Sequence, residues 1–291
     1  MAQFILTGFA DEACPQIEGQ IKALKRNDMD YIEMRGVNGK NVIDLTDEEA
    51  IAIKAMLDKN GIRLSAVGSP IGKIKITDDF APHLEKLKRT VELAKIFETD
   101  KIRLFSFYIP EGEKPETYRD EVLKRMQAML DVADGITLCH ENEHGIYGEA
   151  PDKVLDLHQQ LPDLKAIFDP ANYVCADADI MWGINNINPY IDYLHIKDAI
   201  AGDKAMVPAG KGDGFVAEVL EKVGEKDGTI FLSVEPHLAV FTGYSSIDKR
   251  ELKNKYTYET NDDAFDVAVN ALKEVLTQLG YKKGENNIWK K

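Results

Sequence analysis

Cysteine is scarce in this chain, and its three cysteines cannot all be paired with one another. Cys14, Cys139 and Cys175 include no Cys-x-x-Cys pair, so the sequence indicates neither a disulfide framework nor a cysteine-rich zinc site. Unpaired thiols are typical of a reducing compartment. We therefore expect a cytoplasmic protein.

Long apolar runs and a surplus of basic residues are also absent. No segment approaches the roughly 18 to 20 apolar residues that cross a bilayer. The apolar run 4–10 follows no Lys or Arg and leads into Asp11-Glu12, so no signal peptide is indicated. Lys and Arg number 36 against 50 Asp and Glu, a formal net charge of −14. This charge repels phosphate backbones and anionic membranes, which excludes nucleic acid and membrane from the expected partners.

The sequence further lacks a linker rich in Pro, Gly or Ser, and no Gly-x-Gly-x-x-Gly follows its first β-type run. What it contains is ordinary for a globular protein, with 44% hydrophobic and 30% charged residues. A length of 291 residues suits either two average domains or one α/β barrel. Without a linker, we expect a single domain over residues 1–291.

Short β-type runs alternate along the chain with segments whose apolar residues recur every three or four positions, which is the pattern of amphipathic helices. Only the helix expected near 182–190 is weak, because Pro189 and three Asn interrupt it. Strands followed each time by a helix, without hairpin signals, indicate parallel pairing. Eight units predict an α/β fold, a single (β/α)8 TIM barrel, with a doubly wound open sheet as the alternative. The β-type runs are 4–9, 31–34, 63–67, 102–107, 136–141, 166–169, 193–196 and 230–235.

The segment 239–261, between the eighth strand and the last helix, is the longest without periodicity. A loop of this length is usually a lid, a binding loop or a subunit contact. This segment and the tail with Trp289 are the parts of the chain that we expect to supply an interface in a homo-oligomer.

Ionisable residues end four successive β-type runs. In a TIM barrel the C-terminal strand ends meet on one face, where the chemistry takes place. Three carboxylates and one imidazole form a mostly oxygen site that suits Mn²⁺ best, with Mg²⁺, Co²⁺ or Zn²⁺ as alternatives. The four residues are Glu141, Asp169, His195 and Glu235.

Each of these residues alone also has a purely structural interpretation. A carboxylate at a strand end often caps the next helix or pairs with a surface lysine. His195 lies in an apolar run, where a single histidine is usually a hydrogen-bonded core residue. The four together favour a metal site. Because strand alternation puts Glu141 and Glu143 on the same side, Glu143 is an alternative first ligand.

Four segments of the chain resemble the metal-site segments of the xylose isomerase-like TIM-barrel superfamily, a group of sugar isomerases, ketose 3-epimerases, inosose dehydratases and related lyases. The segments are Leu138-Cys-His-Glu-Asn142, Phe168-Asp-Pro-Ala-Asn172, Leu194-His-Ile-Lys-Asp198 and Val234-Glu-Pro-His237. The resemblance implies that the four strand-end residues bind the metal ion. It also implies that Glu141 and Glu235 act as acid and base on opposite faces of a bound sugar, around an enediolate.

Further residues are candidates for binding the sugar, each beside a structural alternative. Glu33 ends the second strand, Asn172 lies in the second segment of the resemblance, Lys197 shares the alternation side of His195, and His237 follows the last glutamate by two residues. The glycine-rich stretch 210–214 suits a phosphate cradle, but a flexible loop with Asp213 as helix N-cap is the favoured interpretation, so no sugar phosphate is predicted.

The sequence thus predicts a metal-dependent sugar isomerase or epimerase whose partner is a small sugar molecule. A lyase or dehydratase acting on a keto-sugar or inosose with the same enediolate chemistry is the first alternative. A sugar-binding barrel without catalysis is the second. A phosphodiester hydrolase like the endonuclease branch of the superfamily is disfavoured, because the chain is acidic and has one histidine on the last three strands.

Overall fold

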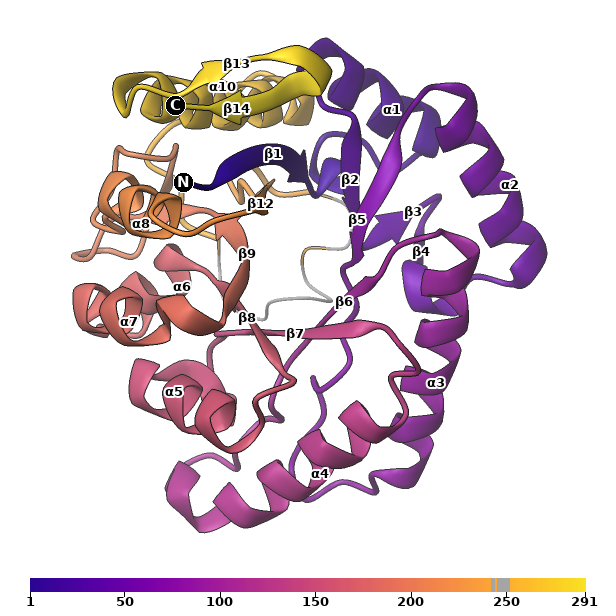
Figure 1. Ribbon diagram of the computed structural model, residues 1–291, viewed down its shortest axis with the longest axis vertical. Helices are drawn as coiled ribbons and strands as arrows, with labels where there is room; N and C mark the ends of the chain where they lie inside the picture. The colour runs from indigo at the N-terminus through magenta and orange to yellow at the C-terminus, as the bar shows by residue number, and fades with distance from the viewer. Residues whose placement is uncertain (242–243, 245–251) are drawn as a thin grey trace.

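Eight parallel strands form the centre of the molecule in the computed structural model, which describes residues 1–241, 244 and 252–291 (Figure 1). Hydrogen bonds join these strands in the order β1-β12-β9-β8-β7-β6-β5-β2, and β1 also packs beside β2. The predicted TIM barrel is thereby confirmed. The strands are β1 (Gln3–Gly8), β2 (Tyr31–Met34), β5 (Arg63–Val67), β6 (Lys101–Leu104), β7 (Thr137–Glu141), β8 (Lys165–Phe168), β9 (Ile191–Ile196) and β12 (Thr229–Val234).

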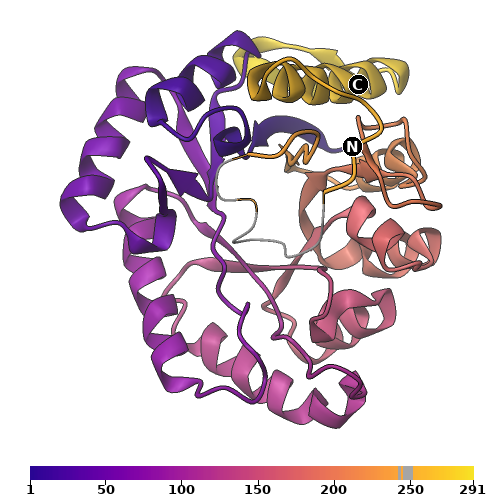
Figure 2. The same cartoon turned by 180° about the vertical axis from the view of Figure 1, so that it is seen from behind.

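Helices surround the strands on the outside, as Figures 1 and 2 show from opposite sides. They bury their apolar stripes against the outer faces of the strands. Where one weak helix was expected near 182–190, the structure has α6 and α7, which begin at the N-caps Asp169 and Asp179, and α7 ends before Pro189. The helices are α1 (Ile17–Arg26), α2 (Asp47–Lys59), α3 (Ala81–Ile96), α4 (Arg119–Asp131), α5 (Pro151–Gln160), α6 (Pro170–Cys175), α7 (Ile180–Ile187), α8 (Val216–Gly224) and α10 (Asn261–Gln278).

The barrel interior changes character along the strands. A small apolar cluster that includes Cys139, Ile167 and Tyr193 lies apart from the main core between strands and helices. Because side chains alternate in a strand, residues two positions further along also face inward. Those positions are Glu141, Asp169 and His195. The same alternation that fills the interior with apolar side chains therefore directs ionisable groups to its C-terminal end.

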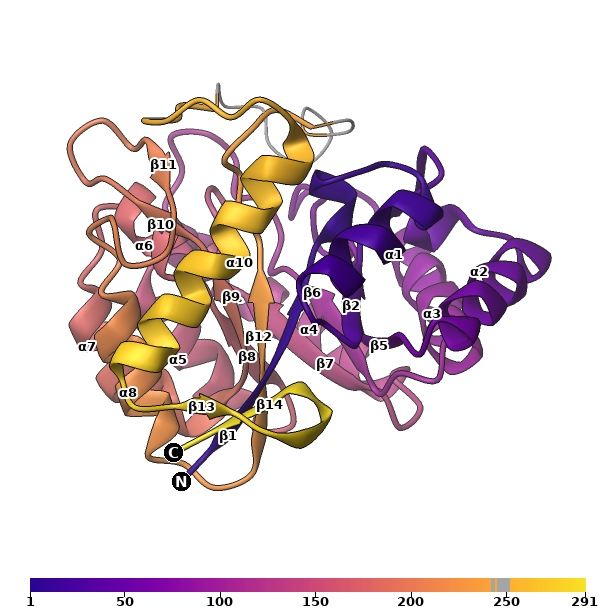
Figure 3. The ribbon, with the colours of Figure 1, turned by 90° about the horizontal axis from the view of Figure 1, so that it is seen from above.

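The N- and C-termini lie close together at one end of the barrel, where a strand of a C-terminal hairpin pairs with β1 (Figure 3). Strands β13 (Lys282–Lys283) and β14 (Ile288–Lys290) form this hairpin, and Trp289 of β14 pairs with Phe4. Trp289 is only 6% exposed. Its ring thus packs within its own chain, and the interface role of the tail stays a prediction.

Two shorter ladders lie outside the barrel. They are β3 (Gly36–Val37) with β4 (Lys40–Asn41), and β10 (Asp198–Ala199) with β11 (Met206–Val207). Part of the predicted long connection 239–261 lies outside the described residues, and its interface role stays a prediction. None of the described helices combines the length and the apolar character needed to cross a membrane.

Candidate metal centre

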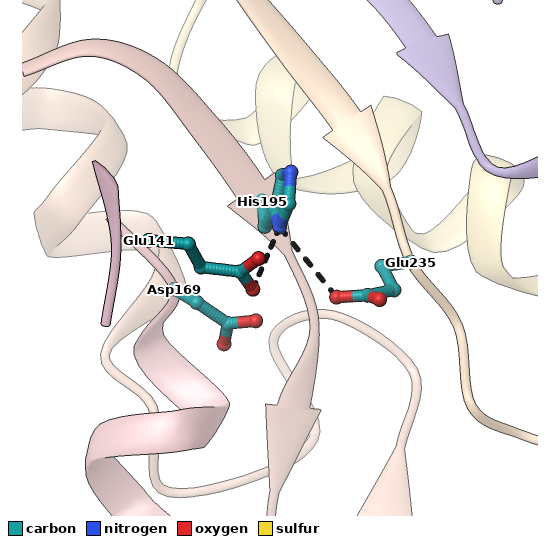
Figure 4. Close-up of side chains that lie close together, drawn as sticks. All are labelled: Glu141, Asp169, His195 and Glu235. Atoms are coloured by element: carbon teal, nitrogen blue, oxygen red, sulfur yellow. Dashed lines mark hydrogen bonds and ion pairs between the residues drawn. The ribbon is translucent and has the colours of Figure 1, made fainter. Parts of the chain in front are cut away.

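The four strand-end residues predicted to bind a metal converge on one point (Figure 4). Glu141 is the last residue of β7, Asp169 and Glu235 directly follow β8 and β12, and His195 lies in β9. Each offers one ligand atom, and these atoms all lie within 4.8 Å of one another. All four side chains are buried. Parallel strands that end on one face thus bring together residues 26 to 94 positions apart in the sequence.

Local structure holds the two ligands from β7 and β8. The Asp169 carboxylate caps α6 by accepting the N–H of Asn172 at 3.0 Å, and Pro170 follows as the first helical residue. Asn142 is linked to the backbone of Asp169 by two hydrogen bonds. The Asn172 amide donates to the Asn142 carbonyl at 2.8 Å and to Glu141 Oε1 at 3.4 Å. Asn172 therefore positions the end of β7 as well as facing the site.

The carboxylate of Glu33, which is not among the four grouped residues, favours one tautomer of His195. Nε2 lies 3.1 and 3.2 Å from the two carboxylate oxygens of Glu33, whose side chain is completely buried. An N–H at Nε2 pointing to Glu33 leaves the Nδ1 lone pair for an ion. Nδ1 faces Glu141 Oε1 at 3.0 Å and Glu235 Oε2 at 3.5 Å. Glu33, predicted as a sugar ligand, thus lies behind the imidazole.

Three buried cationic side chains surround the acidic groups. Lys197 Nζ lies 2.9 Å from Asp169 Oδ2 and 3.1 Å from Glu235 Oε2. Arg103 Nη1 lies 3.2 Å from Glu141 Oε2. Lys197 was predicted from the sequence, but Arg103 was missed. The available signal was an arginine inside the apolar run of β6, at a position that alternation places inside the barrel.

Arg35 joins a group of acidic residues that the sequence alone did not connect. It pairs with Glu235 at 2.9 Å, and with Asp11 and Glu12 at 3.0 and 3.2 Å. Glu12, Glu235 and His237 form a second set with metal-ligand geometry. The Arg35 guanidinium already bridges the carboxylates of Glu12 and Glu235. The positive charge that this second set could accept is therefore supplied by a side chain of the protein.

Burial and neighbouring charge shift the pKa values of the site. Burial raises the pKa of Asp169 to about 7, against the effect of Lys197. Burial alone would lower the pKa of His195, but Glu141 and Glu33 raise it well above its usual value. Burial likewise opposes the charge of Lys197, yet Asp169 and Glu235 raise its pKa well above the usual range. The raised pKa values of His195 and Lys197 reflect stabilisation of their charge by neighbouring carboxylates, whereas that of Asp169 reflects the cost of burying its own charge.

The residues present fit a divalent cation. Among the described residues, six buried carboxylates face the three buried cations, so the site carries an excess of negative charge. Ligands about 2.1 Å from an ion at angles of about 90° to 110° lie about 3.0 to 3.5 Å apart, which is the spacing found around His195 Nδ1. The carboxylates are Asp11, Glu12, Glu33, Glu141, Asp169 and Glu235, and the cations are Arg35, Arg103 and Lys197.

The remaining candidates lie at the edge of this centre. Glu143 pairs with Lys73 at 3.0 Å and is not among the grouped ligand atoms, so the geometry favours Glu141 as the first ligand. His237 is 7% exposed and stacks on Phe241. Its Nε2 has no hydrogen-bond partner among the described residues and lies 3.5 Å from Glu235 Oε1.

Comparisons with known proteins agree with this architecture. A family model described as xylose isomerase-like TIM barrel matches residues 21–251. The fold resembles the probable 3-DHS dehydratase AsbF from Bacillus anthracis, at 18% identity and a TM-score of 0.70 over 94% of this chain and 99% of that one. It also resembles D-psicose 3-epimerase crystallised with D-fructose, at 15% identity and a TM-score of 0.71 over 95% and 99% of the two chains.

A third similar structure is that of the IOLI protein with a zinc atom, at 13% identity and a TM-score of 0.72 over 94% of this chain and 98% of that one. No curated protein matches the chain. At these identities the structural likeness establishes the fold, and the chemistry has to be argued from the site itself.

Proposed function

Because the chain belongs to the xylose isomerase-like TIM barrel family, we propose that it is a divalent-metal-dependent sugar isomerase or epimerase. The observation that carries this proposal is the convergence of Glu141, Asp169, His195 and Glu235 within 4.8 Å. The similar structures include a sugar epimerase and a dehydratase, which supports a sugar-modifying enzyme. We place the protein in the cytoplasm, since its cysteines are free thiols.

Mn²⁺ is the ion that we propose for this centre, since hard oxygen ligands predominate. When bound, a divalent ion polarises a sugar carbonyl and a neighbouring hydroxyl, which lowers the cost of removing the adjacent C–H proton. Glu141, Asp169, His195 and Glu235 would hold the ion. The zinc atom in the IOLI structure is consistent with a related site for a divalent ion.

Glu141 and Glu235 are the proposed acid and base. Figure 4 shows their carboxylates on opposite sides of His195, so a sugar between them would present one face to each. Lys197 and Arg35 hold Glu235, and Arg103 holds Glu141. These charge-assisted bonds fix both carboxylates where a proton must be removed from one face and returned to the other.

Two of the four predicted sugar-binding residues are well placed for that role. Lys197 can donate to a sugar oxygen beside Asp169 and Glu235, and His237 has an unpartnered Nε2 next to Glu235. Asn172 and Glu33 are assigned differently. Asn172 orients Glu141, and Glu33 orients His195.

The Glu33→Gln variant is expected to bind Mn²⁺ about 10- to 100-fold more weakly, as loss of an outer carboxylate partner usually does. The Nε2–H tautomer of His195 leaves Nδ1 free for the ion. The amide that replaces the Glu33 carboxylate no longer favours this tautomer. Calorimetric titration of the metal-free protein measures the change. Glu18→Gln, on the exposed face of α1, is the matched control and should keep the wild-type affinity. Equal affinities for the wild type and Glu33→Gln would disprove the role of Glu33.

The function is tested by incubating the Mn²⁺-loaded protein in D₂O with a panel of ketoses, aldoses, inososes and oxidised glycosides. An epimerase or isomerase incorporates deuterium next to the carbonyl and keeps the carbon skeleton. A lyase, the alternative that the similar dehydratase favours, yields a dehydrated or smaller product. Saturable binding without exchange or product over the whole panel would replace the proposal by a sugar-binding barrel.

A further inference from the structure

The loop between β9 and α8 folds its glycine amides around an internal carboxylate. Asp198 is 1% exposed. Its Oδ2 accepts the N–H groups of Gly210 and Gly212, and its Oδ1 accepts those of Gly214 and Ala199, all at 2.9 Å. The three glycine amides are those of the stretch that suited a phosphate cradle in the sequence. These amides already bind an anionic group, which is the Asp198 side chain of the protein itself.

The backbone of this loop has the form of an anion nest. The alternate residues Lys211 and Asp213 donate their N–H groups to backbone carbonyls at 3.0 and 2.8 Å, so within 210–214 it is the glycine amides that turn toward Asp198. A Cβ on Gly212 or Gly214 would lie 2.4 or 2.7 Å from Asp198 Oδ1. Glycine is thus required for the carboxylate to enter.

Asp213 does not cap the following helix, contrary to the simpler interpretation of the stretch. The helix α8 begins at Val216 with Phe215 as its N-cap, and the Asp213 carboxylate accepts the N–H of Ala201 at 2.7 Å instead. Asp213 therefore closes the loop upon itself. The loop is ordered by its own two carboxylates, without need of an external ligand.

The nest lies beside the metal centre. Asp198 follows Lys197, which contacts two of the metal ligands. A Cβ on Gly214 would lie 3.2 Å from Pro170, which directly follows the ligand Asp169. In TIM barrels a substrate phosphate is frequently held by the loops after the seventh and eighth strands, and β9 is the seventh barrel strand.

We propose that the Asp198 carboxylate occupies the phosphate position of this barrel and thereby restricts the enzyme to sugars without a phosphate group facing this loop. A phosphate arriving there would find all four amides engaged and would meet a like charge, which disfavours its binding. The inference deepens the proposed function by naming a substrate class. The state of the nest itself can be tested without any turnover.

The test uses protein labelled with [¹⁵N]glycine and titrated with inorganic phosphate at constant ionic strength. In the wild type, the amide signals of Gly210, Gly212 and Gly214 should not shift. In Asp198→Gly the amides are released, and we expect saturable shifts together with a rise in melting temperature of about 2 °C when phosphate exceeds its Kd about tenfold. Asp198→Asn keeps one accepting oxygen in the nest but turns an NH₂ group toward the other amides, so both effects should be smaller than in Asp198→Gly.

Saturable shifts of these three amides in the wild type would overturn the proposal, and this holds even if Asp198→Gly fails to fold. A folded Asp198→Gly variant that ignores phosphate would also overturn it. For a sugar that the enzyme converts, kcat/KM should exceed that of the phosphate ester by about 100-fold or more. Preference for the ester would contradict the proposal. If no sugar is converted, the proposed function fails, while the amide titration still decides the state of the nest.

Discussion

Glu141→Gln is expected to lower the turnover number by about 10³-fold, within the 10²- to 10⁴-fold range usual for loss of a general acid or base. The variant removes the proposed proton-transferring group and weakens one proposed metal ligand. It keeps the fold, because the amide oxygen can still accept from Arg103. The rate of deuterium incorporation from D₂O at saturating sugar measures the effect, and metal analysis of the same sample separates lost ion from lost proton transfer.

Glu143→Gln is the matched control, because it makes the same change two residues further along the chain. Glu143 pairs with Lys73 and lies outside the grouped ligand atoms. Its loss should therefore alter turnover by less than about tenfold. The reverse order of effects would show that Glu143 is the first ligand. Equal small effects would remove Glu141 from the chemistry altogether.

The barrel could be predicted from the sequence because nearly all of its strands and helices show a clear spacing of apolar residues. Strands β2 and β5 have the predicted bounds, and the others differ by up to three residues at an end. The exception is the pair α6 and α7. Helix α6 has six residues, too few to show a helical period, and its start depends on the capping geometry of Asp169, which also serves the site.

The centre could be predicted only as far as topology determines it. Strand ends meet on one face in any such barrel, so the four ligands followed from their positions alone. Partners across the interior do not follow from positions. Glu33 and His195 are 162 residues apart, and their contact depends on strand stagger and side-chain rotamers. Alternation within β6 could have placed Arg103 inside the barrel, but its pairing with Glu141 of the neighbouring strand also depends on side-chain rotamers.

Removal of the bound ion should destabilise the protein markedly. Buried carboxylates outnumber buried cations in the centre, and their repulsion is relieved when a divalent ion binds. An ion that binds only the folded state stabilises it by about 4 kcal/mol at 1,000 times its Kd, or about 7 °C in melting temperature for a chain of this size. Thermal unfolding of chelator-treated protein, with Mn²⁺ or Mg²⁺ added back, measures this gain.

Asp169→Asn and Asp156→Asn distinguish binding at this centre from unspecific stabilisation. Asp169 is a proposed ligand and pairs with Lys197, so its variant should lose most of the metal-dependent gain. Asp156 pairs with Arg119 outside the centre, so its variant should melt earlier than the wild type but keep the full gain. If both variants respond alike, the ion binds elsewhere. If the wild type itself gains nothing from any divalent ion, the four strand-end residues serve only as a buried charge network, and a metal-dependent reaction has no place in this barrel.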